Sequence, residues 1–231
     1  MSLSLPVSDG PGLRAELVAK VVSLNVGMPR EHTWRGKPVT SGIWKQPVAG
    51  RVAATGHNLA GDGQADLTVH GGRDKAVYAY PIEHYPFWRR ELGVERLEHG
   101  CFGENLTTEG LLEVDVGIGD RFRVGSALLE VTQPRIPCHK LAMRHGRADL
   151  PKRFLASGRS GVYFAIVGEG ELGEGDTLER IERDPHGISV ADIQRLARGE
   201  PDEAMLRRAV EHPRLAQVWR DQFRDQLARG S

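Results

Sequence analysis

One of the two cysteines in this chain stands where thiol chemistry is favoured. Cys138 lies in the stretch QPRIPCHKL, directly after a proline and close to Arg135, His139 and Lys140. Nearby positive charge stabilises a thiolate, which is both a nucleophile and a metal ligand. The stretch by itself is equally compatible with a small buried residue near the end of a strand. The remainder of the chain has to decide between these interpretations.

A second candidate stretch, DLTVHGGRDKAVYAYP at 66–81, combines a glycine pair with several cations. Adjacent glycines allow backbone N–H groups to converge on an anion, and the basic side chains that follow add positive charge. The alternative is an ordinary loop with solvated charges. The candidate binding residues of this stretch are His70, Gly71, Gly72, Arg73 and Lys75.

A third stretch, GCFGENLTTEG at 100–110, places short polar side chains between glycines. Asn105 is its candidate for binding a polar ligand, although such side chains also satisfy backbone groups in turns. Cys101 follows Glu98 and His99 rather than a basic cluster, so it is expected to be structural.

Mixed zinc ligation is a further alternative, but the spacing argues against it. The chain contains no C-x-x-C pair and no H-E-x-x-H motif, which are typical of zinc sites. The residues that zinc ligation would need are Asp62, Asp66, His70, Cys138 and His139.

Composition narrows the class of protein. The chain has 231 residues, with 31 basic and 31 acidic side chains, so nothing suggests a nucleic acid as partner. No apolar run is long enough to span a bilayer, and residues 1–17 lack the pattern of a signal peptide, so a cytoplasmic protein is expected. Two cysteines are too few for a conventional iron–sulfur cluster, and no G-x-G-x-x-G fingerprint is present.

Short strand-like runs with Gly, Pro and Asp between them predict a mainly β fold, barrel-like or a folded-over sheet. The first strand is expected at 18–26, and Gly125-Ser126 is expected to form a hairpin turn. Residues 81–92 are expected to be a helix interrupted near Pro86, and residues 151–157 a short helix.

The pattern changes to helical periodicity after Pro185. Ser189 and Asp192 form a capping-box-like start, and two further amphipathic segments follow. The chain is therefore divided into a lead-in at 1–17, a β domain at 18–184 and a small three-helix domain at 185–231.

Taken together, SLNVG, DLTVHGGRDKAVYAYP, GCFGENL and IGDRFRVGSALLEVTQPRIPCHKL resemble the MOSC domain family. The order of these motifs is similar to that in stand-alone bacterial proteins of the N-hydroxylaminopurine-resistance subgroup, which carry a C-terminal three-helix domain. The resemblance spans roughly residues 18–183, and it implies a β-barrel-like fold that binds the molybdenum cofactor (molybdopterin) through a cysteine.

The resemblance makes Cys138 the ligand to molybdenum and a catalytic residue, because thiolates suit this metal. It implies that Arg135 and Lys140 meet the phosphate of the cofactor. The glycine turn and the cations Arg73 and Lys75 suit that phosphate or the pterin edge. It also implies that Asn105 bonds the pterin or the substrate. His70 and His139 are the candidate proton carriers.

The implied activity is reduction of N-hydroxylated compounds, such as N-hydroxylaminopurines, by a molybdenum-dependent oxidoreductase. The implied partners are a small-molecule N-hydroxylated substrate and an external electron-donor reductase, for which a flavin enzyme is a candidate; a homodimer is the candidate assembly. Two alternatives stay open: a cofactor or sulfur carrier that uses Cys138, and a non-catalytic binding module.

Overall fold

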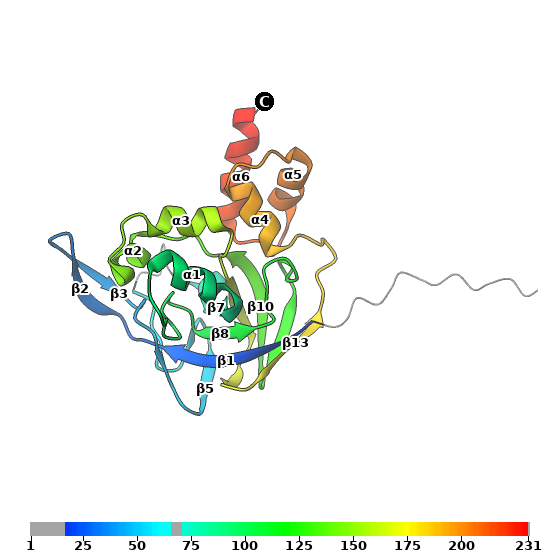
Figure 1. Ribbon diagram of the computed structural model, residues 1–231. Helices are drawn as coiled ribbons and strands as arrows, with labels where there is room; N and C mark the ends of the chain where they lie inside the picture. Colours follow the sequence, from blue (N-terminus) through cyan, green and yellow to red (C-terminus); the bar gives the residue numbers. More distant parts are fainter. Residues whose placement is uncertain (1–16, 66–70, 231) are drawn as a thin grey trace, which may run out of the picture.

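The computed structural model describes residues 17–65 and 71–230, and its centre is a closed barrel of seven strands (Figure 1). The strands follow the order β13-β9-β10-β11-β7-β8-β1, and β13 closes the ring by pairing with β1. Neighbouring strands are antiparallel except for β7 and β8, which are parallel. The barrel strands are β1 (Val18–Val26), β7 (Val77–Pro81), β8 (Leu106–Glu109), β9 (Arg121–Val124), β10 (Ala127–Pro134), β11 (Val162–Gly168) and β13 (Thr177–Glu182).

Shorter strands extend this barrel. The hairpin of β2 (Arg30–Trp34) and β3 (Lys37–Ser41) projects away from it at the left of Figure 1. The end of β1 pairs with β4 (Gln46–Pro47). A small separate sheet contains β5 (Arg51–Thr55), β6 (Asn58–Leu59) and β12 (Gly170–Gly173).

The mainly β fold and several local predictions are confirmed. The first strand has the predicted bounds, and Gly125, with φ of 58°, forms the turn between β9 and β10. The prediction for 81–92 is wrong in detail: β7 runs to Pro81, a 3-10 turn η2 (Ile82–His84) follows, and α1 (Tyr85–Leu92) then begins. Pro86 lies in the first turn of α1, where its missing N–H costs nothing, so it does not interrupt the helix.

Three short helices pack on the barrel through a mainly aromatic second core. They are α1, α2 (His139–His145) and α3 (Leu150–Ser157), and α3 has a proline in its first turn, as predicted. Trp88 of α1 stacks on Phe154 of α3, with ring centroids 5.3 Å apart, and Tyr80 of β7 packs against Phe102. The predicted strand residues at 66–70 lie outside the described residues.

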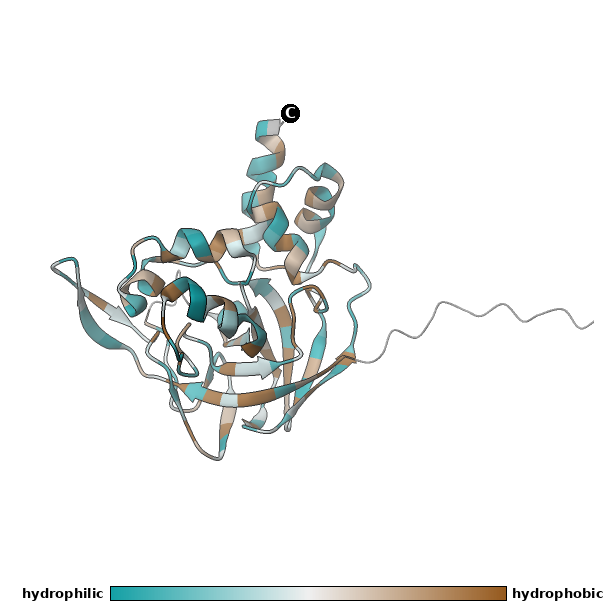
Figure 2. Cartoon of the chain, viewed as in Figure 1, coloured by the Kyte–Doolittle hydropathy of each residue, from teal (hydrophilic) through white to brown (hydrophobic). Residues whose placement is uncertain are grey.

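The C-terminal helices share the hydrophobic core of the barrel. They are α4 (Val190–Ala197), α5 (Glu203–Glu211) and α6 (Gln217–Gly230), and the predicted capping box of Ser189 and Asp192 is present. Ile193, Trp219 and Phe223 belong to the same buried cluster as the barrel residues Phe122 and Phe164. Apolar and polar stretches alternate along both the helices and the barrel strands in Figure 2. Apolar burial therefore holds the helices to the barrel.

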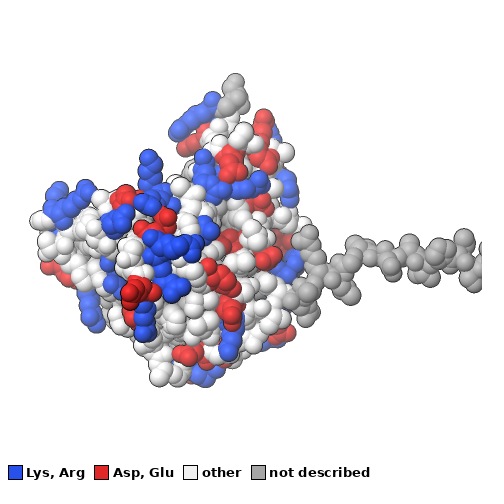
Figure 3. All heavy atoms as spheres, in the orientation of Figure 1, with Lys and Arg blue, Asp and Glu red and all other residues white. Residues whose placement is uncertain are grey.

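Basic and acidic side chains are interspersed on the face of the molecule shown in Figure 3, in keeping with a formal net charge of zero. Among the described residues, no helix combines the length and the apolar character needed to cross a membrane.

Candidate functional site

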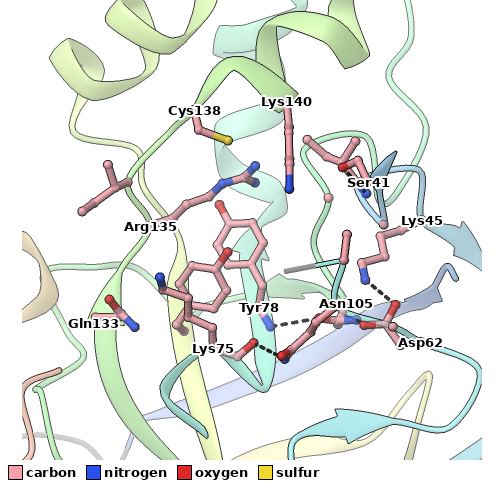
Figure 4. A pocket seen from close by; sticks show the side chains of 18 residues that line it. Ser41, Lys45, Asp62, Lys75, Tyr78, Asn105, Gln133, Arg135, Cys138 and Lys140 are labelled. Carbon is pink, nitrogen blue, oxygen red and sulfur yellow. Dashed lines mark hydrogen bonds and ion pairs between the residues drawn. The ribbon is translucent and has the colours of Figure 1, made fainter. Parts of the chain in front are cut away.

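A pocket gathers residues from segments far apart in the sequence (Figure 4). Its walls come from the loop after β3, the segment 62–65, the 3-10 turn η1 (Arg73–Lys75), β7, the loop before β8, the end of β10, α2 and β11. The polar side chains in its lining are Ser41, Lys45, Asp62, Gln64, Lys75, Tyr78, Asn105, Gln133, Arg135, Cys138, Lys140 and Tyr163.

Cys138 is presented at the rim of this pocket. The barrel strand β10 ends at Pro134, and a short segment leads through Pro137 to Cys138, which occupies the N-cap position of α2 without a side-chain capping hydrogen bond. The two prolines restrict the backbone of this segment. The thiol is partly exposed, and Figure 4 shows it beside the side chains of Arg135 and Lys140. The thiol is therefore accessible, and two cations lie next to it.

Arg135 is a fixed positive charge below the thiol. Its side chain is buried, its Nη1 donates a hydrogen bond to the carbonyl oxygen of Phe102, and its guanidinium lies 4.8 Å from the ring centroid of Tyr78. An arginine cannot lose its proton in a protein, so this charge must be met by π-electrons, carbonyl oxygens or a bound anion.

A buried ion pair that the sequence did not indicate completes the pocket floor. The Nζ of Lys45 donates to Oδ1 of Asp62, and Oδ1 also accepts from the backbone N–H of Gly27 at 2.9 Å. Burial lowers the pKa of Lys45, and the neighbouring Asp62 carboxylate partly opposes that shift. Lys45 and Asp62 are 17 residues apart, and no local pattern marks them as a pair; the sequence suggested Asp62 only as a possible zinc ligand.

Asn105 lies in the pocket lining, but protein groups use its amide. Its Oδ1 accepts from the backbone N–H of Tyr78 at 3.1 Å. Its Nδ2 donates to the carbonyl oxygen of Asn25 at 3.3 Å and to Oδ2 of Asp62 at 2.9 Å. Both amide protons are thereby engaged. In this structure Asn105 holds β1, β7 and the pocket floor together, whereas the sequence suggested a bond to pterin or substrate.

The glycine turn contributes to the pocket mainly through Lys75. Gln64 anchors the turn: its Oε1 accepts from the N–H of Gly72 at 2.7 Å, and its Nε2 donates to the carbonyl oxygen of Lys75 at 3.1 Å. Gly71 and Gly72 do not line the pocket, and His70 lies outside the described residues.

Arg73 and His139 are not part of the pocket lining, although the sequence grouped both with its ligands. The guanidinium of Arg73 instead contacts Glu130, because consecutive residues of η1 project in different directions. His139, the first residue of α2, is exposed. For zinc ligation, Asp62 is already paired with Lys45, and Asp66 lies outside the described residues.

Cys101 differs from Cys138 in its surroundings. It is buried in the aromatic second core, and burial together with the nearby Glu104 raises the pKa of its thiol. A protonated thiol is a poor nucleophile and a poor metal ligand. The structure therefore places the accessible thiol at Cys138, and Cys101 remains a packing residue.

The buried His145 of α2 is expected to make the stability of the fold depend on pH. Burial lowers the pKa of His145 to about 4, while its Nε2 lies 3.0 Å from the carbonyl oxygen of Cys101. Between pH 6.5 and pH 4 this histidine binds a proton in the unfolded state but stays neutral in the folded state. The free energy of unfolding is therefore expected to fall as the pH falls. The His145→Gln variant keeps a hydrogen-bond donor and should lose about 2 kcal/mol less over this window. Urea unfolding at pH 7 and pH 4.5 measures the difference, and equal losses in both proteins would contradict the assignment.

Comparisons with known proteins agree with this fold. The MOSC domain family model matches residues 66–179, and the YiiM-like, 3-alpha helix domain model matches residues 188–230. The Bacillus subtilis protein YflK is 41% identical over 204 residues, which cover 88% of this chain and 92% of YflK. A protein named Reductase from Gibberella moniliformis is 37% identical over 71% of this chain, but that match covers only 29% of the fungal protein.

A solved structure extends the comparison to the whole fold. The crystal structure of YiiM from Geobacillus stearothermophilus superposes with a TM-score of 0.75 at 38% identity, covering 90% of this chain and 99% of YiiM. MOSC domains are associated with binding or sulfuration of the molybdenum cofactor. Extensive identity, a matching fold and both family models lead to one conclusion: this chain belongs to the MOSC domain family and carries a YiiM-like three-helix domain at its C-terminus.

Proposed function

We propose that this chain is a molybdenum-cofactor-dependent reductase of N-hydroxylated compounds, with Cys138 as the protein ligand to the metal. The observation that carries the proposal is an accessible thiol at the rim of a pocket that also contains Arg135, Lys140, Lys75 and Lys45. The reductase name of the fungal relative and the association of MOSC domains with this cofactor support the same reaction class.

The donor set of the pocket fits the chemical groups of this cofactor. A thiolate is a soft ligand of the kind that a sulfur-coordinated metal accepts, and Cys138 is the thiol in the pocket. A phosphate needs cations and hydrogen-bond donors, which Arg135, Lys140 and Lys75 supply. The rings of Tyr78 and Tyr163, with centroids 4.7 Å apart, add an apolar wall. We therefore assign the cations to the anionic end of the cofactor.

When bound, the cofactor would supply the electron pair needed to remove the oxygen of an N–OH group. The chain would supply protons and orientation. Lys45 is the best-placed acid, because burial lowers its pKa and its side chain lines the pocket. Asp62 would hold the Lys45 Nζ in place through their ion pair. We assign proton delivery to Lys45 rather than to His139, which is exposed and outside the pocket lining.

Electrons are expected to come from a separate reductase, because the sequence has two cysteines and no dinucleotide fingerprint. A cofactor or sulfur carrier is the second candidate function, favoured by the partial exposure of the Cys138 thiol. A carrier would retain the cofactor or a persulfide without turning over a substrate, which distinguishes the two candidates.

The test compares protein purified from a host that makes the molybdenum cofactor with protein from a host that cannot. Molybdenum analysis should find the metal only in the first preparation. That preparation should reduce an N-hydroxylated purine when reduced viologen is supplied, and should not do so with NADPH alone. Metal without turnover would favour the carrier, and equal metal in both preparations or efficient turnover with NADPH alone would overturn the proposal.

A further inference from the structure

A second concave site, here called the junction groove, lies between the barrel and the C-terminal helices. Its charged and amide-bearing lining comes from η1, β9, β10, the segment before α6 and α6 itself. The residues on which the argument depends are Arg73, Arg121, Glu130, Arg214, Gln217 and Arg220. None of the six belongs to the lining of the Cys138 pocket.

Glu130 is the central carboxylate of the junction groove, and it accepts hydrogen bonds from three arginines. Its side chain is only 4% exposed. Oε2 accepts from Nε of Arg121 at 2.9 Å and from Nη1 of Arg214 at 3.0 Å, while Oε1 accepts from Nη2 of Arg73 at 3.3 Å. One negative charge is thus shared among three guanidiniums.

Three further carboxylates, those of Asp74, Glu182 and Asp184, oppose the positive charge of these arginines. Asp74 lies 3.2 Å from Arg73, and Glu182 lies 3.0 Å from Arg121. Their side chains are 38% and 43% exposed, so water screens their charges more than that of Glu130. Arg214 also lies 3.6 Å from Glu182 and 4.0 Å from the buried Asp184, which is shared with His186 and His212.

Arg220 adds a fourth cation to the junction groove. Its Nη2 donates to Oε1 of the neutral Gln217 at 2.5 Å, and within residues 17–65 and 71–230 no carboxylate lies within ion-pair distance of it. Its Nε is buried and lacks a hydrogen-bond partner among the same residues. Because arginine stays protonated, Arg220 keeps a positive charge that no carboxylate of these described residues pairs.

We propose that the junction groove binds a phosphate group, either as inorganic phosphate or as the terminal group of a phosphomonoester. A planar guanidinium presents paired N–H donors that match two phosphate oxygens, and several converging arginines are the usual solution for a dianion. The free N–H groups of Arg220 and of the half-exposed Arg73 would hold the phosphate. Its negative charge would pair the guanidinium of Arg220, which has no carboxylate partner among the described residues.

The junction groove and the Cys138 pocket meet at one structural element. Arg73 and Asp74 of η1 line the groove, while Lys75, the last residue of η1, lines the pocket. The carbonyl oxygen of Asp74 also accepts from Nε2 of Gln133 at 2.9 Å, and Gln133 lines the pocket. A phosphate held by Arg73 would therefore restrain the same turn that carries Lys75.

Isothermal titration calorimetry on the full-length protein tests the proposal, with inorganic phosphate and a nucleoside monophosphate as separate probes at constant ionic strength. Arg220→Gln is expected to weaken phosphate binding about tenfold, the effect of losing one charge-assisted contact. Arg224→Gln is the matched control, because Arg224 lies on the same helix and is already paired with Asp221. Arg224→Gln is expected to change the affinity less than about twofold.

A third variant, Lys140→Gln, separates the two sites, because Lys140 lines only the Cys138 pocket. It should leave phosphate binding at the junction groove unchanged. Tighter binding of the nucleotide than of inorganic phosphate would identify the ligand as a phosphomonoester, and the reverse would identify it as free phosphate. The proposal is overturned by a wild-type protein that does not bind millimolar phosphate, by equal losses in Arg220→Gln and Arg224→Gln, or by a loss confined to Lys140→Gln.

Discussion

Replacing Cys138 with serine is expected to abolish molybdenum retention, whereas Cys101→Ser is expected to leave it nearly intact. The Cys138 thiol is partly exposed at the pocket rim beside Arg135 and Lys140, and a serine hydroxyl is a poor substitute for a soft sulfur ligand. Cys101 is buried among aromatic rings, where burial raises the pKa of its thiol, and it does not line the Cys138 pocket. Metal analysis of the three proteins, each purified from a cofactor-producing host, measures the effect.

Folding has to be controlled in this experiment. Cys138→Ser exchanges one partly exposed atom, so its unfolding midpoint should match that of the wild type. Cys101→Ser places a hydroxyl in an apolar cluster and should be the less stable variant of the two. Equal molybdenum contents in two folded variants would show that Cys138 is not the ligand.

Trp219→Ala is expected to lower the free energy of unfolding of the whole protein by about 4 kcal/mol. The Trp219 side chain is 1% exposed in the core that the barrel and helices share. Its Nε1 also donates to Oε1 of Gln133 at 3.1 Å, so the substitution would leave a buried acceptor without a partner. Urea unfolding followed by circular dichroism gives the difference.

The neighbouring residue provides the control for this prediction. Val218 lies on the same helix but is 49% exposed, so Val218→Ala should cost less than about 0.5 kcal/mol. If Trp219→Ala melted α6 alone, with the barrel transition unchanged, the helices would form an independent domain. A single shifted transition would support one cooperative unit and a structural role of α6 beneath the pocket wall at Gln133.

Residues with local signals could be predicted from the sequence by itself. A β-branched, apolar run predicted β1 with its correct bounds, Gly125 predicted the β9–β10 turn, and Ser189 with Asp192 predicted the start of α4. Each signal acts within a few residues, because strand periodicity, turn conformation and helix capping depend on neighbouring backbone groups. The ordered motifs likewise predicted the family, and the basic context of Cys138 distinguished it from Cys101.

Contacts between distant segments were decided only by the tertiary structure. The folded chain brings Lys45, in the loop before β4, to Asp62, in the segment after β6, and it places the amide of Asn105 in protein hydrogen bonds. The turn η1 places Lys75 in one site and Arg73 in another, although the two residues are separated by a single position. The helices that appear separate in the sequence share the core of the barrel, because burial of apolar surface depends on which faces meet in space and not on their order along the chain.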